Sequence, residues 1–259
     1  SRGLGDVYKR QVFQDDENDY TPDSIFPNNW ISFHENGDVG LFPMYAKNRR
    51  LERRPEVLEF LETEGFTISN IVDYSSAESE NKFLEGTGSM ILDRKNRIAY
   101  CSISNRSNED LFIEFCEDFE FTPVIFNSFQ SVGDKRLPIY HTNVMMCVAT
   151  DYVIICLDSI DDKKQRKHIS NFIIASGKKL IEISEKQVES FAGNMLELIN
   201  ENGESILVMS KSAEDSLDEN QRNIITNHSR IISCDINTIE VCGGGSTRCM
   251  MAEIFLPKK

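Results

Sequence analysis

An internal repeat constrains the fold of this chain more than any other feature of its sequence. Two short strands joined by a turn, then a helix, then a third strand recur four times, with a period of roughly fifty to sixty residues. A period of this length is typical of propellers and arrays, so we predict an α/β fold of repeated ββαβ units. The predicted hairpins occupy residues 30–42, 90–103, 144–157 and 195–209, and the third strands 68–72, 123–126, 179–183 and 230–233.

Turn and helix signals mark the borders of these units. Asn36-Gly37 and Asn202-Gly203 predict hairpin turns. Pro55 predicts the start of the first helix, and glycines at 65 and 177 predict helix ends. A fifth unit begins at residue 250, where the apolar run 250–256 predicts one buried strand before the chain stops. The predicted helices cover residues 55–65, 109–119, 161–176 and a stretch that ends at about 227.

The residue just before each hairpin or strand run is small and polar, or nucleophilic, in all five units. If the units surround a pseudo-fivefold axis, these five residues converge at its centre, as a small-ligand pocket requires. The alternative is that polar residues simply precede strands in turns. The five residues are Asn29, Ser89, Asn143, Asn194 and Cys249.

Cys249 lies at the end of a glycine-lined loop. Gly243 to Gly245 can adopt backbone angles that are closed to other residues, which lets a ligand approach the main chain. Free cysteine is among the most buried residue types, so Cys249 alone would favour a structural role. Its place in the ring instead makes it a candidate nucleophile, since the thiolate is the reactive form of cysteine.

Two further residues lie close to ring positions in the sequence. Glu85 stands among glycines four residues before Ser89, and His141 stands two residues before Asn143. A histidine can pass a proton to a leaving amine, and a carboxylate can fix its tautomer. Cys249, His141 and Glu85 are therefore candidates for nucleophile, acid-base group and orienting carboxylate. The alternatives are a hydrogen-bonded loop histidine and a glutamate in a solvated turn.

Composition excludes several classes of function. The net charge of −14 argues against a nucleic-acid partner. No apolar run is long enough to span a membrane, and the N-terminus has no signal-peptide pattern. The seven cysteines show no CxxC spacing, which favours a reducing, cytoplasmic location, and the four scattered histidines predict no metal site and no cofactor.

Residues 1–11, SRGLGDVYKRQ, do not match the pattern of residues 12–259. We interpret them as a translated adaptor or cloning artefact and exclude them from the fold. Residues 12–259 are predicted to form a single domain.

Seven ordered motifs resemble the amidinotransferase superfamily of guanidino-group-modifying enzymes, and most of all the bacterial citrulline-utilisation hydrolases. The resemblance implies the pentein fold, a five-bladed α/β propeller around a pseudo-fivefold axis. It extends over nearly all of residues 12–257. The motifs are SIFPNNW (24–30), LFPM (41–44), NRR (48–50), FLEGTGS (83–89), YHTNVMM (140–146), FAGNM (191–195) and GGGSTRCM (243–250).

The resemblance also implies a covalent mechanism. Cys249 would attack the central carbon of a guanidino or ureido group, and His141 would protonate the departing amine and then activate water. Glu85 would orient His141 or bind the terminal nitrogens of the substrate. Arg106 matches an arginine that meets a substrate carboxylate, although a surface arginine is the alternative. The substrate-binding residues implied in this way are Phe26, Asn29, Arg106, Asn143, Asn194, Gly245 and Ser246.

Two departures from the family pattern bear on the substrate. Asn29 and Asn143 stand where arginine-specific members carry aspartates. An amide offers both a donor and an acceptor, whereas a carboxylate in a closed pocket favours a cation. We therefore predict hydrolysis of a neutral ureido group, with citrulline giving ornithine, carbon dioxide and ammonia. Arginine or succinylarginine hydrolysis and amidino transfer are alternatives, and a catalytically inactive binding module is a further one.

The same resemblance implies an N-terminal strand ahead of Val12 that this chain lacks. We expect that strand to be the partner of residues 250–256, so the fifth unit would have an unpaired edge. The predicted partner is a small guanidino or ureido amino acid, and a homo-oligomer is possible.

Overall fold

The computed structural model describes residues 11–259 except residues 17 and 19, and it contains the four predicted units. Each unit forms a three-stranded sheet whose first two strands are antiparallel and whose third strand is parallel to the second. The sheets are β1 (Ile31–Phe33), β2 (Asp38–Leu41) and β3 (Asn70–Asp73); β4 (Met90–Asp93), β5 (Ile98–Ser102) and β6 (Thr122–Phe126); β9 (Met146–Val148), β10 (Tyr152–Ile155) and β11 (Lys179–Glu182); β12 (Leu196–Ile199), β13 (Ser205–Ser210) and β14 (Arg230–Cys234).

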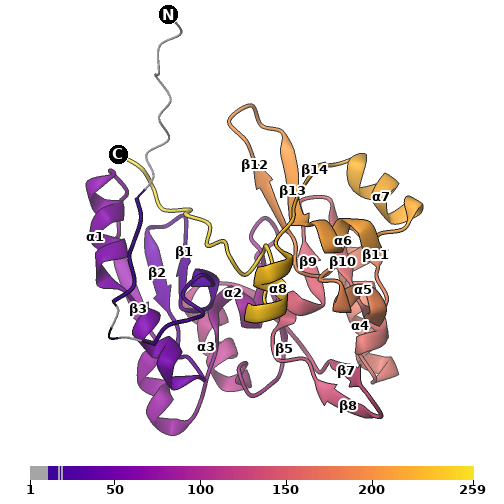
Figure 1. Cartoon of the computed structure of the whole chain (residues 1–259), viewed down its shortest axis with the longest axis horizontal. Coiled ribbons are helices and arrows are strands. Elements are labelled where there is room, and N and C mark those ends of the chain that lie inside the picture. The colour runs from indigo at the N-terminus through magenta and orange to yellow at the C-terminus, as the bar shows by residue number, and fades with distance from the viewer. Residues whose placement is uncertain (1–10, 17, 19) are drawn as a thin grey trace, which may run out of the picture.

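A helical connection precedes the third strand of every sheet, as the repeat predicts. Helices α1 and α4 lie at the periphery, while α8 (Asn237–Gly243) lies near the middle, between the first and last units (Figure 1). The likeness of the four units confirms the predicted α/β architecture. The connecting helices are α1 (Pro55–Thr63), α3 (Glu109–Asp118), α4 (Lys163–Ala175), and the pair α6 (Lys211–Ser216) and α7 (Glu219–Thr226).

Local chemistry explains where these elements begin and end. Pro55 occupies the first turn of α1, and the chain leaves that helix through Gly65 at a φ of 88°. The side chain of Asp162 accepts hydrogen bonds from the amides of Lys164 and Gln165 and so caps α4. At the first hairpin, Gly37 has a φ of 90°, which glycine tolerates without strain.

Buried side chains form a core beneath the sheets. The largest cluster joins the second, third and fourth units through residues such as Tyr100, Tyr152 and Leu207. A second cluster is rich in aromatic rings, among them Phe112, Phe115 and Phe119. These two clusters pack neighbouring units against one another, and a third cluster lies mainly in the first unit.

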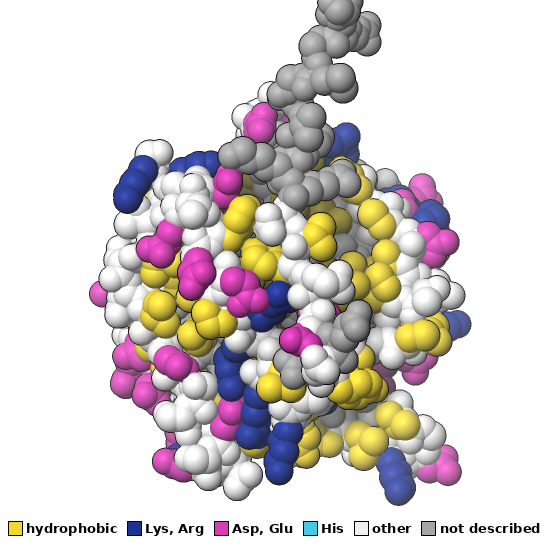
Figure 2. Space-filling model, turned by 60° about the vertical axis from the view of Figure 1, so that its left-hand side comes forward, with side chains coloured by type: hydrophobic (Ala, Val, Ile, Leu, Met, Phe, Trp, Pro, Cys, Tyr) yellow, Lys and Arg dark blue, Asp and Glu magenta, His cyan; other side chains and the backbone are white. Residues whose placement is uncertain are grey.

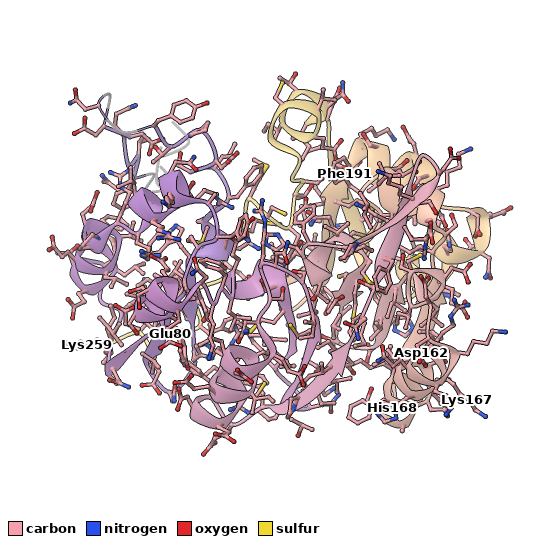
Figure 3. The ribbon with its side chains drawn as sticks, turned by 90° about the horizontal axis from the view of Figure 1, so that it is seen from below. Glu80, Asp162, Lys167, His168, Phe191 and Lys259 are labelled. Carbon is pink, nitrogen blue, oxygen red and sulfur yellow. The ribbon has the colours of Figure 1, made fainter. Side chains whose placement is uncertain are left out.

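The predicted strand over residues 250–256 is wrong. A strand needs a neighbour for its backbone hydrogen bonds, and among the described residues this run pairs with none. The chain makes only an isolated bridge between Lys258 and Phe66, and Leu256 alone is fully buried. The C-terminal segment instead runs back to the first unit, where the amide of Lys259 donates to the Gly65 carbonyl (Figures 1 and 3).

Several elements have no counterpart in the predicted repeat. They are the exposed hairpin β7 (Phe129–Val132) and β8 (Lys135–Pro138), the helices α2 (Gly86–Ser89), α5 (Glu185–Glu189) and α8, and the 3-10 turns η1 (Pro27–Asn29), η2 (Lys47–Glu52), η3 (Ser75–Glu80), η4 (Thr142–Val144) and η5 (Leu157–Ser159). Three of them, η1, α2 and η4, stand directly before a first strand. They set the direction of the ring residues.

The surface and the cysteines agree with the composition. On the face in Figure 2, acidic side chains are spread between apolar ones, and Lys and Arg do not dominate it. No helix within the described residues is long and apolar enough to cross a membrane. All seven cysteines are free thiols, and Cys234 and Cys242 are the exposed ones. The interpretation of residues 1–11 falls outside the described part of the chain, apart from Gln11.

Candidate active site

Tight turns place four of the five ring residues just before the first strands, and a further turn carries Cys249. Asn29 ends η1, Ser89 ends α2 and Asn143 lies within η4. Asn194 follows a turn in which Phe191, labelled in Figure 3, has a φ of 61°. Cys249 lies in a turn closed by its own amide, which donates to the Ser246 carbonyl at 3.0 Å. All five residues are buried.

Three of the five side chains come together. The Nδ2 atoms of Asn143 and Asn194 lie 3.4 and 3.2 Å from the Cys249 sulfur. Asn29 packs on Gly88 so closely that a Cβ there would lie 2.2 Å from its Nδ2 atom and 3.0 Å from the His141 Nδ1 atom. Ser89 differs, because its hydroxyl donates to the Arg106 carbonyl and accepts from the Glu85 amide. Ser89 therefore braces the backbone that carries Glu85.

Glu85 and His141 form a buried pair next to this group. The Nε2 atom of His141 lies 2.7 Å from the Glu85 Oε2 atom, and Arg106 approaches the same oxygen at 3.2 Å. The other carboxylate oxygen accepts the Tyr45 amide at 2.9 Å. The guanidinium of Arg106 also lies over the rings of Tyr45 and Tyr140, with its side chain 30% exposed. Glu85 is thus held from three sides.

These contacts set the protonation of the pair. Burial alone raises the pKa of Glu85, but His141, Arg106 and the Tyr45 amide outweigh it and hold the pKa at about 2. Burial lowers the pKa of His141, and Glu85 opposes that change. Because Arg106 and the Tyr45 amide act whether or not His141 is charged, Glu85 remains a carboxylate beside a neutral imidazole near neutral pH.

Arg49 is a buried site residue that the sequence did not single out. Its guanidinium donates to Asn29 Oδ1 at 2.7 Å and to the Phe26 carbonyl at 3.1 Å, and it pairs with Glu52 at 2.8 Å. The Asn29 amide is thereby fixed with its nitrogen toward Gly88. The motif NRR (48–50) contains Arg49, but it did not point to Asn29.

The glycine loop packs under two aromatic rings. A Cβ on Gly243 or Gly245 would approach the Phe26 ring to 2.9 or 2.8 Å, so larger residues there would displace it. On the other side, the hydroxyl of Tyr140 donates to the Gly244 carbonyl at 2.9 Å. The Ser246 hydroxyl donates to Glu240 at 2.6 Å. Phe26 and Tyr140 therefore hold the loop over Cys249.

A cavity of about 1040 Å³ lies among the first strands of the four units and residues 250–255. Glu85, His141 and Cys249 do not line it, although Thr87 and Arg248 do. Side chains able to perform acid-base and nucleophilic chemistry locate an active site better than an apolar cavity does. Within the described residues, no three His, Cys, Asp or Glu side chains gather as metal ligands.

Solved structures share this architecture. The N-terminal domain of ArgZ with bound substrate, an arginine dihydrolase from the ornithine-ammonia cycle in Cyanobacteria, matches with a TM-score of 0.66 and 20% identity over 91% of this chain and 78% of that chain. AgrE in complex with ornithine and NAD+ matches with a TM-score of 0.68 and 21% identity over 92% and 31%. A dimethylarginine dimethylaminohydrolase adduct with S-methyl-L-thiocitrulline matches with a TM-score of 0.58 and 14% identity over 88% and 76%.

At these identities the likeness shows the fold alone, and this fold is the predicted pentein fold. The chain spans about a third of the length of the full ArgZ and AgrE chains. The predicted resemblance and the pentein fold are confirmed.

A family model assigns the chain more closely. The model described as "N,N dimethylarginine dimethylhydrolase, eukaryotic" matches residues 9–256, and the chain belongs to this family. No curated protein matches the sequence. The family model is named for the hydrolysis of dimethylarginine.

Proposed function

We propose that this protein is a cysteine-dependent hydrolase that converts citrulline to ornithine, carbon dioxide and ammonia. The observation that carries the proposal is the cluster of Asn143, Asn194 and Cys249 beside the buried Glu85–His141 pair. It supplies a nucleophile, a proton carrier and a carboxylate that holds the carrier in one orientation.

The proposed reaction balances in two steps. His141 first takes up a proton from solvent. The Cys249 sulfur then bonds to the ureido carbon, the bond to one nitrogen breaks, and His141 delivers this proton to the departing amine. The neutral His141 next accepts a proton from water as the water oxygen attacks the same carbon and releases the sulfur as thiolate. The carbamate that results yields carbon dioxide, so one water is consumed for each citrulline. Glu85, hydrogen-bonded to Nε2, stabilises the imidazolium that is present before the first step and forms again in the second.

The charge balance of the site favours a neutral substrate group. The charged residues that act on His141 are Glu85, Arg106 and Arg49. Arg106 already pairs with Glu85, and Glu52 pairs with Arg49, so the site has no unpaired carboxylate among these residues. A cationic guanidinium would have to displace Arg106 from Glu85. A ureido group needs only neutral partners, and the Oδ1 atom of Asn143, which has no partner among the described residues, offers one acceptor.

Arginine is the second candidate substrate. ArgZ is named an arginine dihydrolase, and AgrE has been solved with L-arginine. The side chain of Arg106 is 30% exposed and so has room to leave Glu85 for a substrate carboxylate. The same sulfur and imidazole would then act on a guanidinium.

Parallel assays of citrulline, arginine, methylarginines and succinylarginine test the proposal. We expect kcat/KM for citrulline to exceed that for arginine by about tenfold or more, since each factor of ten needs only about 1.4 kcal/mol of differential binding. Faster turnover of arginine would overturn the preference for a ureido group. Cys249→Ser should abolish turnover, and Cys242→Ser, which changes an exposed cysteine on α8, is the matched control.

A further inference from the structure

The amide of Asn194 is fully used by the nucleophile turn. Its Oδ1 atom accepts the amides of Arg248 and Cys249 at 3.0 and 3.4 Å. Its Nδ2 atom donates to the Asn143 carbonyl at 3.0 Å and to the Cys249 sulfur at 3.2 Å. If the Asn194 amide were reversed, its NH2 group would face the backbone N–H groups of Arg248 and Cys249, and its oxygen would face the Asn143 carbonyl. Both contacts would be repulsive, so only one orientation of the amide is compatible with its neighbours.

Asn143 approaches the same sulfur from a different unit. Its Nδ2 atom lies 3.4 Å from Sγ, while its Oδ1 atom is buried with no hydrogen-bond partner among the described residues. A thiol donates one hydrogen, whereas a thiolate only accepts. Two N–H groups aimed at one sulfur therefore match the thiolate, which accepts from both.

The other charged and titratable groups near Cys249 are engaged elsewhere. His141 directs Nε2 to Glu85, the Tyr140 hydroxyl donates to Gly244, and the Arg248 guanidinium binds the Met251 carbonyl and Glu253. Within the described residues, the donors on the sulfur are thus the two side-chain amides. Neither amide titrates, so the hydrogen bonds that they donate to the sulfur do not depend on the protonation state of His141.

We propose that Asn143 and Asn194 form an amide clamp that holds the Cys249 sulfur as an aimed thiolate, so that both are positioning residues for the nucleophile. The clamp assigns these residues to the sulfur rather than to substrate alone, and it rests on the proposed function through Cys249. It also explains how the sulfur can react next to a neutral histidine. The free Oδ1 atom of Asn143 leaves one acceptor for a substrate N–H.

Alkylation of Cys249 by iodoacetamide at a series of pH values tests the clamp without any substrate. Peptide mapping separates Cys249 from the exposed Cys234 and Cys242. The remaining cysteines stay silent near neutral pH, because burial raises the pKa of Cys116 and Cys147 to about 12 and raises those of Cys101 and Cys156. The pH of half-maximal alkylation then reports the thiolate directly.

The variants Asn194→Leu and Asn143→Leu remove an N–H donor at nearly constant volume and add no charge. We expect each to move half-maximal alkylation upward by about one pH unit and to slow alkylation at neutral pH about tenfold. Asn223→Leu, on the exposed face of α7, is the matched control and should change neither value. If one variant does not fold, the other still tests the clamp from its own unit.

An unchanged alkylation profile in the folded variants would overturn the clamp, even if they lose activity or thermal stability. A shifted profile supports it even if citrulline proves not to be the substrate. If Cys249→Ser keeps full turnover, the proposed function fails, while the alkylation profile still decides whether the sulfur is clamped.

Discussion

Two buried histidines in this protein, His34 and His141, each make a short hydrogen bond through Nε2, but we expect only His141 to take part in proton transfer. The Nε2 atom of His34 lies 2.9 Å from the Ser32 hydroxyl, and that of His141 lies 2.7 Å from the Glu85 carboxylate. Both side chains are almost fully buried. In the sequence each histidine is adjacent to a predicted strand, so pattern alone does not separate them.

Their surroundings separate them. The His34 ring stacks on Phe119 at 4.0 Å, and burial together with Arg94 and Arg97 lowers its pKa to about 3. His141 meets a carboxylate that opposes the effect of burial, and its ring lies against Gly88 and the ring of Tyr140 rather than against phenylalanines. Burial makes both imidazoles neutral, but only His141 has a partner that can stabilise a proton gained during a reaction.

Exchanging the two histidines for alanine gives the sharpest contrast. His141→Ala should lower kcat by on the order of 10³-fold with little change in Tm, because it removes the proton carrier. Steady-state assays and thermal unfolding of the same preparations measure both. If His34→Ala lost as much activity while remaining folded, the distinction between the two sites would be wrong.

The carboxylate partner should matter next most. Glu85→Gln keeps the shape but removes the charge that supports His141, so we expect kcat to fall on the order of 10²-fold. Glu78→Gln is the control, because Glu78 pairs with Arg53 and Arg50 rather than with a histidine. Equal losses in the two variants would argue against a specific role of Glu85.

His34→Ala should instead cost stability. Removing a ring stacked among Phe115, Phe119 and Phe121 leaves a cavity in a packed cluster, so the free energy of unfolding should fall by about 2–4 kcal/mol. Denaturant unfolding measures the change. A stable variant with impaired turnover would assign His34 to the active site.

The low pKa of His34 also predicts a pH dependence of stability. His34 binds a proton near pH 6.5 in the unfolded chain but only at about pH 3 in the folded chain. The contribution of neutral His34 to the free energy of unfolding is therefore fully present above pH 6.5 and is lost as the pH falls from 6.5 toward 3. Between pH 7 and pH 5 this amounts to about 2 kcal/mol. Unfolding at several pH values should show the slope in the parent and a smaller one in His34→Ala. An equal slope would place the titration elsewhere.

Arg106→Gln should have the smallest effect. Arg106 is partly exposed and shares the Glu85 oxygen with His141, so its loss should raise KM about tenfold and change kcat less. Arg136→Gln, which breaks exposed pairs with Asp161 and Glu185, is the control. A loss confined to kcat would place Arg106 in the proton transfer rather than in substrate binding.

Local signals made much of the fold predictable. Turn dipeptides, the proline of α1 and the alternation of short strands all act within a few residues, and the four units obey them. The meeting of Asn143, Asn194 and Cys249 follows the prediction that the ring residues converge, whereas Asn29 lies against Gly88 and Arg49. Glu85 and His141 were predicted from their closeness in sequence to Ser89 and Asn143.

Features that depend on distant partners were not predictable. The run 250–256 is apolar, yet without a neighbouring strand it forms no ladder. The hydrogen bond from Arg49 to Asn29 joins two different 3-10 turns, so it depends on how these turns pack. The hydrogen bond from Tyr140 to Gly244 joins residues 104 positions apart. All residues of β8 are exposed, so this strand lacks the alternation of apolar and polar residues by which a strand is predicted. These features arise from packing between units rather than from any one unit.

The central claim is that Cys249 forms a covalent bond to the substrate carbon. Acid quenching of the parent protein during its first turnovers of citrulline, followed by mass mapping of every cysteine-containing peptide, tests this directly. We predict an adduct on the peptide that carries Cys249 and none on those that carry Cys234 or Cys242. Release of ornithine with no adduct on Cys249, or with the adduct on another residue, would contradict the account.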